Sequence, residues 1–243
     1  YNQASTGDHG AIDIETSLKG DSTRYGLACD GCSDSVIVFL PDEGGDPIKF
    51  DIVTAKRNNM VYGDIQIGDK LAILPNPIDP YEAAMVIDLE QMKGTWTFQV
   101  LPKLKPNPTK TEDEILAGMS DSLKKALFIP REYGFTLKSY NQASPVGYIL
   151  KSNSLEDESP VEYPKVTVYT SWHIYKDTID ERGHRIPQDS VGFDAGSMRY
   201  LSADSMAALF GKKVMQYHRK KSAMEANKEA QEAEAKAAKQ DTI

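Results

Sequence analysis

The only two cysteines of the chain, Cys29 and Cys32, enclose Asp30-Gly31. Two thiolates at this spacing can form a small-loop disulfide, act as a redox pair or supply half of a zinc site. A thioredoxin-type pair needs a helix after the second cysteine, whereas the apolar run at residues 36–40 predicts a strand. We favour a structural role at a hairpin turn, with Cys29 and Cys32 as reduced thiols or as a disulfide, and leave the redox and metal alternatives open.

Residues that could catalyse a reaction do not form a recognisable pattern. The chain has no nucleophile elbow, zinc-protease helix, Walker loop or dinucleotide-binding glycine motif. Histidine, the usual general base, occurs only singly, at His9, His173, His184 and His218. The acidic loop at residues 155–164 lacks the turn glycine and regular spacing of a calcium loop, so we interpret it as a solvated loop. We expect no enzyme, catalytic residue, metal site or cofactor.

The length and net charge of the chain exclude several classes of protein. A chain of 243 residues, 40% hydrophobic and 26% charged, predicts one or two globular domains with a sizeable core. The net charge of -8 argues against nucleic acid as a partner. No apolar run approaches the roughly 20 residues of a membrane-spanning helix. Residues 1–22 are rich in Gly, Ser, Thr and Asp, which predicts a flexible leader or tether.

The elements that must position any site are mostly strands. Five or six short strands between turn signals at residues 23–91 predict a small antiparallel β-barrel or sandwich, with one strand at residues 48–54. A second strand-rich unit begins at Gly94-Thr95-Trp96. A capping box and an apolar stripe predict one helix at residues 111–128, covering a barrel end or an open face. Residues 203–209 have the propensity for a helix, but we favour a closing β-hairpin at residues 200–217.

The basic run at residues 212–221 is interpreted as an exposed strand face. After it, residues 222–243 are an Ala/Glu/Lys segment that predicts a C-terminal helix. Alanines at alternating three- and four-residue steps form a seam on this helix. It could dock on a partner or on the body, although a solvated helix has the same composition. The seam residues are Ala223, Ala226, Ala230, Ala233 and Ala237.

The second unit contains three short motifs of aromatic, glycine and small polar residues, and both tryptophans of the chain belong to these motifs. The motifs are Gly94-Thr95-Trp96, Tyr133-Gly134-Phe135 and Tyr169-Thr170-Ser171-Trp172. Over residues 92–221 this pattern resembles the lipocalin-like, calycin-type domains of Bacteroidota envelope lipoproteins. Residues 23–91 look like an OB-like small barrel paired with such a domain. The expected fold is therefore mostly β, with two small antiparallel barrels or sandwiches, one inserted helix and a helical tail.

The resemblance implies a non-catalytic outer-membrane or periplasmic lipoprotein, whose only membrane contact is a lipid anchor upstream of Tyr1. Its expected role is a binding or interaction module accessory to a TonB-dependent nutrient-uptake complex. The partner would be an outer-membrane transporter or its lipoprotein subunits. The alternative is a carrier whose second barrel holds a small apolar ligand. That cavity would be lined by Trp96, Phe98, Phe135, Tyr148 and Trp172, unless these side chains only fill the core.

Overall fold

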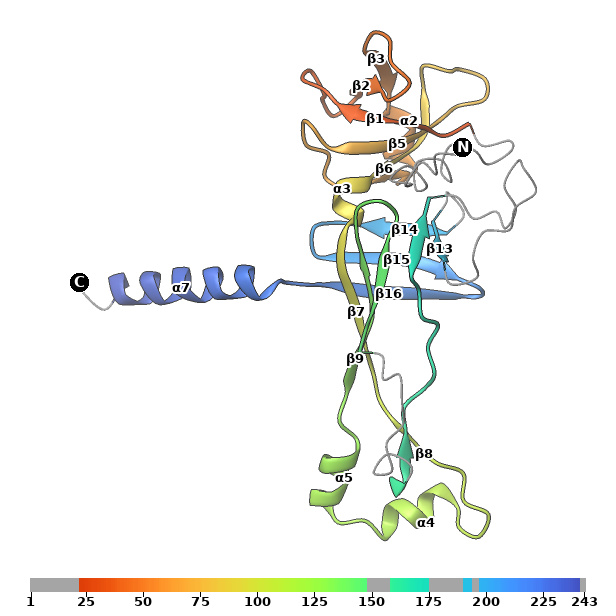
Figure 1. Ribbon diagram of the computed structural model, residues 1–243, viewed down its shortest axis with the longest axis vertical. Helices are drawn as coiled ribbons and strands as arrows, with labels where there is room; N and C mark the ends of the chain where they lie inside the picture. The colour runs from red at the N-terminus through yellow and green to blue at the C-terminus, as the bar shows by residue number, and fades with distance from the viewer. Residues whose placement is uncertain (1–21, 148–157, 175–189, 194–196, 241–243) are drawn as a thin grey trace, which may run out of the picture.

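The computed structural model describes residues 22–147, 158–174, 190–193 and 197–240. A six-stranded sheet forms the upper end of the molecule in Figure 1. Its strands are β1 (Arg24–Ala28), β2 (Val36–Pro41), β3 (Ile48–Asp51), β4 (Val61–Tyr62), β5 (Lys70–Pro75) and β6 (Ala83–Asp88). They lie in the order β3-β2-β1-β5-β6-β4, antiparallel except for the parallel pair of β4 and β6. Both β3 and β4 are therefore end strands of this first sheet.

Alternation of side chains gives this sheet two apolar faces. Leu71 and Ile73 on β5 pack into a core that belongs to the first sheet alone. Between them, Ala72 points to the opposite face, where it joins a second core. The strand predicted at residues 48–54 ends earlier, because the Oδ1 atom of Asp51 accepts the backbone N–H of Val53 at 2.8 Å and a short helix begins there. This helix is α2 (Val53–Arg57).

A second six-stranded sheet lies below the first (Figure 1). Its strands are β7 (Gly94–Val100), β9 (Arg131–Leu137), β10 (Ala143–Val146), β14 (Met198–Leu201), β15 (Ser205–Phe210) and β16 (Lys213–Lys220). Their order is β10-β9-β7-β16-β15-β14, so the first strand of the unit pairs with the last. The hairpin predicted at residues 200–217 is found as β15 and β16. Two further pairs are β8 (Lys103–Leu104) with β11 (Val161–Glu162), and β12 (Ser171–His173) with β13 (Ser190–Gly192).

The prediction of a single helix at residues 111–128 that covers a barrel end or an open face is wrong in two respects. The chain forms α4 (Glu112–Ala117) and α5 (Asp121–Leu127). The break follows from Gly118 at the end of α4 and from Ser120, whose hydroxyl accepts the N–H of Leu123 and starts a new helix. Neither helix covers a sheet. Both lie at the far end of an arm that β7, β9 and β8 extend away from the body (Figure 1).

The prediction of a mostly-β chain with a C-terminal helix is confirmed. That helix, α7 (Ala223–Gln240), projects sideways from the body in Figure 1. Neither six-stranded sheet closes into a barrel within the described ranges. The barrel and lipocalin-like details therefore stay predictions.

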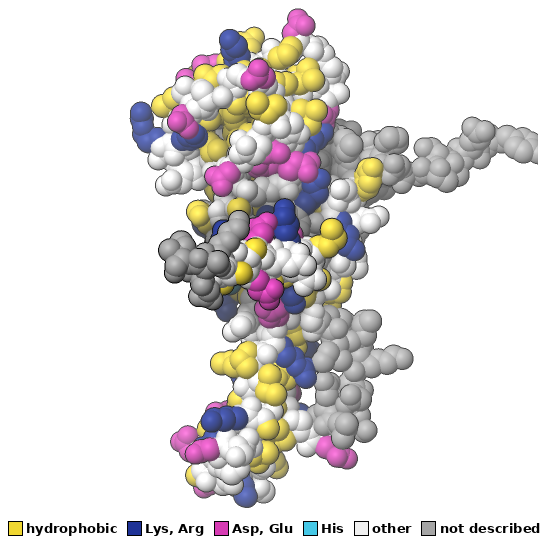
Figure 2. Space-filling view, turned by 90° about the vertical axis from the view of Figure 1, so that its left-hand side faces the viewer, with side chains coloured by type: hydrophobic (Ala, Val, Ile, Leu, Met, Phe, Trp, Pro, Cys, Tyr) yellow, Lys and Arg dark blue, Asp and Glu magenta, His cyan; other side chains and the backbone are white. Residues whose placement is uncertain are grey.

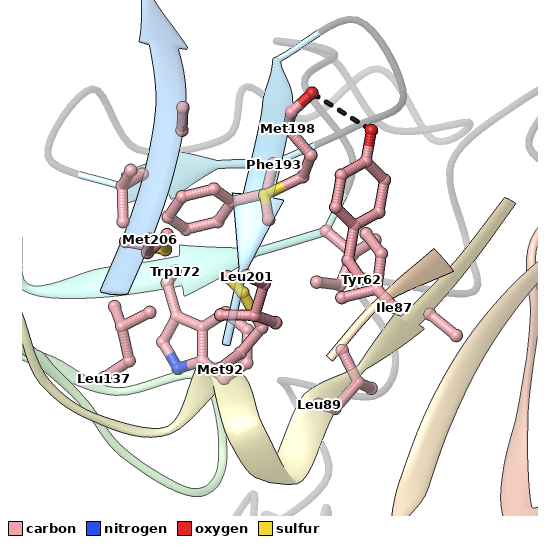
Figure 3. Close-up of a cluster of buried hydrophobic side chains, with 14 of the residues drawn as sticks. Tyr62, Ile87, Leu89, Met92, Leu137, Trp172, Phe193, Met198, Leu201 and Met206 are labelled. Carbon is pink, nitrogen blue, oxygen red and sulfur yellow. Dashed lines mark hydrogen bonds between the residues drawn. The ribbon is translucent and has the colours of Figure 1, made fainter. Parts of the chain in front are cut away.

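A shared hydrophobic core joins the two sheets. From the first sheet and the helix after it, α3 (Leu89–Met92), come Tyr62, Ile87 and Met92. From the second sheet come Met198 and Leu201, and Figure 3 shows these side chains packed against one another. The boundary predicted near residue 92 falls between α3 and β7. The division into separate domains stays a prediction.

The side chain of Arg219 on β16 forms hydrogen bonds across the junction between the two sheets. Its guanidinium donates hydrogen bonds to the backbone carbonyls of Lys93, at 2.6 Å, and of Gln91 and Ala203. The guanidinium carbon also lies 4.2 Å from the ring centroid of the fully buried Trp96. A planar cation with several donors satisfies both the carbonyls at the end of α3 and the face of the indole. One side chain thus holds α3, β7 and the β14–β15 turn together.

Gly94 makes room for this arginine. A Cβ atom at Gly94 would lie 2.2 Å from the Nη1 atom of Arg219, and the φ angle of Gly94 is +130°. Replacement Gly94→Ala should therefore strain the backbone and displace the guanidinium. We expect the free energy of unfolding to fall by about 2 to 4 kcal/mol. Urea denaturation followed by circular dichroism measures this change.

The matched control is Gly45→Ala. The φ angle of Gly45 is +103°, and no heavy atom lies within 4 Å of the added Cβ, so only the backbone strain remains. We expect this variant to lose about 1 kcal/mol. Equal losses in the two variants would show that the contact with Arg219 contributes nothing.

Candidate functional site

A groove of about 970 Å³ lies at the junction of the two sheets. Residues 32–34, α2 and residues 59–66 form the wall on the side of the first sheet. Residues 199–201 of β14 form the opposite wall. The groove is thus built from segments that are far apart in the sequence and are brought together by the shared core.

The groove has an apolar floor and a polar rim. Ile37 and Ile52 form part of the floor and are 1% and 2% exposed. On the rim, the Nζ atom of Lys56 lies 3.0 Å from an Oδ1 atom of Asp34. Tyr200 is 53% exposed although it lines the groove. The arrangement suits a ligand that is partly apolar and also forms hydrogen bonds.

An edge strand of each six-stranded sheet lines this groove. Both β4 and β14 are end strands, each with a strand neighbour on one side only in the part of the chain that is described. The hydroxyl of Tyr62 on β4 donates a hydrogen bond of 3.2 Å to the backbone carbonyl of Met198 on β14 (Figure 3). Burial raises the pKa of Tyr62, while the charge of Arg199 opposes the rise, so the hydroxyl keeps its proton at neutral pH. End strands offer backbone donors and acceptors to an added strand.

Cys32 is the one candidate site residue from the sequence that lines the groove. Its Sγ atom accepts the N–H of Val38 at 3.3 Å and lies 3.1 Å from the carbonyl oxygen of Cys29. The two sulfur atoms are not bonded to each other in this structure, and a strand follows the pair. No cluster of three or more His, Cys, Asp or Glu with metal-site geometry occurs among the described residues. A disulfide between Cys29 and Cys32 stays a prediction.

Four of the five side chains predicted to line a barrel cavity, those of Trp96, Phe98, Phe135 and Trp172, lie together in the shared core. Trp96 and Trp172 are buried, and their indole N–H groups donate at 2.8 Å to the carbonyls of Met92 and Lys138. Phe98 and Phe135 line a smaller pocket of about 150 Å³. Tyr148 lies outside the described residues. The volume of this smaller pocket, about 150 Å³, is below the roughly 300 Å³ of a common ligand pocket.

The alanine seam is solvent-exposed. All five of its alanines lie on exposed stretches of α7, which Figure 2 views from its far end. The helix is held at its start by Ser222, whose hydroxyl accepts the N–H of Glu225 at 3.2 Å. Docking of the seam on a partner stays a prediction. None of the helices in the described ranges is both long enough and apolar enough to cross a membrane.

Comparisons with known proteins give no relative: no family model, no curated protein and no solved structure matches the chain. Function must therefore be argued from the groove itself. Sequence reasoning missed Lys56, Arg199 and Tyr200, since no spacing rule connects α2 with β14. The only signal near the groove was the cysteine pair.

The carboxyl group of Asp88 is buried next to Gly63, which lines the groove. Asp88 is 1% exposed, and its Oδ1 atom accepts the N–H of Gln91 at 3.1 Å, which caps α3. Burial raises the pKa of Asp88 to about 7, and the hydrogen bond that the protonated carboxyl group donates to the side chain of Asp69 adds to the rise. Asp69 in turn accepts the N–H of Gln66, a groove residue, at 2.7 Å. The carboxyl group of Asp88 thus holds a proton next to α3.

The proton on Asp88 makes the free energy of unfolding depend on pH. In the unfolded chain Asp88 titrates near its ordinary value of 3.8, so the folded chain binds more protons between that pH and about 7. The stability gained from this proton is complete below the unfolded value and is lost as the pH rises through about 7. We expect wild type to lose about 2 kcal/mol between pH 5 and 8 from this group, and Asp88→Asn to lose much less.

Urea midpoints at the two pH values measure this difference. The exposed Asp46→Asn is the matched control and should keep the wild-type dependence on pH. A variant Asp88→Asn that keeps the same dependence would contradict the assignment of the proton to Asp88.

Proposed function

We propose that this protein is a non-catalytic binding module, and that its groove receives an extended peptide segment of a partner protein. The observation that carries the proposal is the meeting of two end strands, β4 and β14, along one groove of about 970 Å³. An extended segment could pair its backbone with such a strand while its side chains reach the apolar floor. That volume lies at the upper end of the range for ligand pockets.

The side chains on the rim of the groove favour a peptide as the ligand, rather than a purely apolar molecule. Tyr200 offers an aromatic side chain that is already half out of solvent, which is typical of an interface anchor. Arg199 and Asp64 add charges of opposite sign on the two sides of the groove. Charges of this kind set the direction and register of a bound segment more than its affinity.

We also propose a cell-envelope setting, with a lipocalin-like second unit and a nutrient transporter or its lipoprotein subunits as the partner. The resemblance of residues 92–221 and the polar composition of residues 1–22 support the setting. Pairing of β7 with β16 supports the fold, because a closed up-and-down barrel needs its first and last strands to pair.

The peptide part is tested with a displayed library of random peptides selected on the full chain. A selected peptide, labelled with a fluorophore, is then titrated with wild type and with Tyr200→Ala. We expect the variant to weaken binding about tenfold or more, since it removes the anchor from the groove. The matched control is Tyr81→Ala, a side chain that is 65% exposed and lies outside the groove.

Two outcomes would contradict the peptide proposal. One is a selection that yields no peptide above background. The other is equal weakening by Tyr200→Ala and Tyr81→Ala, which would place the bound peptide elsewhere on the surface.

The envelope part is tested by fractionating the cells in which the natural gene is expressed. We expect the protein to sediment with membranes, to resist high salt and to be released by detergent, as an acyl-anchored protein does. Recovery of all the protein in the soluble fraction would count against a lipid anchor, without bearing on the groove.

A further inference from the structure

Five aromatic rings surround a small pocket in the second sheet. We call it the aromatic pocket, and its rings belong to Phe98, Phe135, Tyr169, Phe210 and Tyr217. They come from β7, β9, the segment before β12, β15 and β16. The pocket has a volume of about 150 Å³. It is distant in the fold from the groove, and no residue lines both.

Neighbouring rings of the pocket meet at angles between 32° and 86°. The planes of Phe98 and Tyr217 meet at 86° with centroids 5.5 Å apart, and those of Phe210 and Tyr217 meet at 80°. Phe135 and Tyr169 meet at 80° with centroids 5.9 Å apart. These rings are not a parallel stack. Because all five line the pocket, a group held in it lies against several rings at once.

None of the described residues that line the pocket is charged. Burial raises the pKa values of Tyr169 and Tyr217, so both hydroxyls are neutral at physiological pH. The lining therefore offers no anion to a primary ammonium, whose three N–H groups would lose hydrogen bonds on leaving water. A quaternary ammonium has no N–H group, and its charge is attracted to the faces of aromatic rings.

Size and long-range charge agree with such a ligand. A cavity of about 150 Å³ lined by apolar side chains can hold a benzene molecule, so a trimethylammonium group with four heavy atoms also fits. The net charge of -8 attracts cations and disfavours anions. Phe98, Tyr169, Phe210 and Met215 are only partly buried, which leaves the pocket within reach of solvent.

We propose that the aromatic pocket binds a quaternary ammonium group. The ligand could be a free choline-like molecule, a lipid headgroup or a trimethylated lysine, since all present the same cation. This inference goes beyond the peptide groove and does not depend on it.

The test uses isothermal titration calorimetry on the full chain with choline and with 3,3-dimethyl-1-butanol. The two ligands have nearly the same shape, but only choline is charged. We expect choline to bind at least about tenfold more tightly than the neutral alcohol. Phosphocholine and a peptide with trimethyl-lysine, titrated in the same way, identify which source of the cation fits best.

Variants locate the binding in the pocket. Tyr169→Leu removes one ring and keeps an apolar side chain, and we expect it to weaken choline about tenfold. The control is Tyr140→Leu, a side chain that is 62% exposed and does not line the pocket. Thermal melting of both variants verifies that they fold.

Equal affinity for choline and the neutral alcohol would overturn the proposal in favour of a simple apolar pocket. A lack of saturable choline binding to wild type at about 10 mM would overturn it too, as would equal effects of the two tyrosine variants. The comparison on wild type needs no variant, so it decides the question even if Tyr169→Leu fails to fold.

Discussion

Arg219 brings a positive charge into the junction between the two sheets, where three backbone carbonyls and the indole of Trp96 surround it. The carbonyls belong to the end of α3 and to the β14–β15 turn. Because α3 is the link between the first sheet and β7, this contact fixes the direction in which the chain leaves one sheet and enters the next. The shared core, the meeting of β4 with β14, and the groove between them all follow from that direction.

The groove and the aromatic pocket use different parts of the same second sheet. The groove lies at its end strand β14, and the aromatic pocket lies over β7, β9, β15 and β16. The shared core between the sheets supplies the rigidity for the groove, since Leu201 contributes to both. A binding site built on packed strands keeps its shape without a ligand, which lowers the entropy lost on binding.

The sequence predicted what depends on local pattern. The apolar run of β2, the closing hairpin of β15 and β16, and the Ala/Glu/Lys composition of α7 were each predicted as the element that is found. Two short helices were mistaken for one, because the apolar stripe continues across Gly118 and Ser120 while the hydrogen bonding does not. Arg219 was missed because it sits in a run of basic residues that otherwise resembles an exposed face. Its partners are carbonyl groups, which have no signature in a sequence. The groove could not be predicted for a similar reason: Lys56 and Tyr200 meet only through the packing of two sheets.

The arm that ends in α4 and α5 has a consequence for how this protein can change over generations. No residue of either helix is buried, and Leu101, Leu123 and Ile129 on the arm are exposed. Figure 2 shows hydrophobic side chains along the arm, away from the two sheets. Substitutions at the tip therefore leave both cores intact, and selection for a new contact there is separated from selection for stability. The arm is the part of the molecule in which lineages can diverge at little risk to the fold.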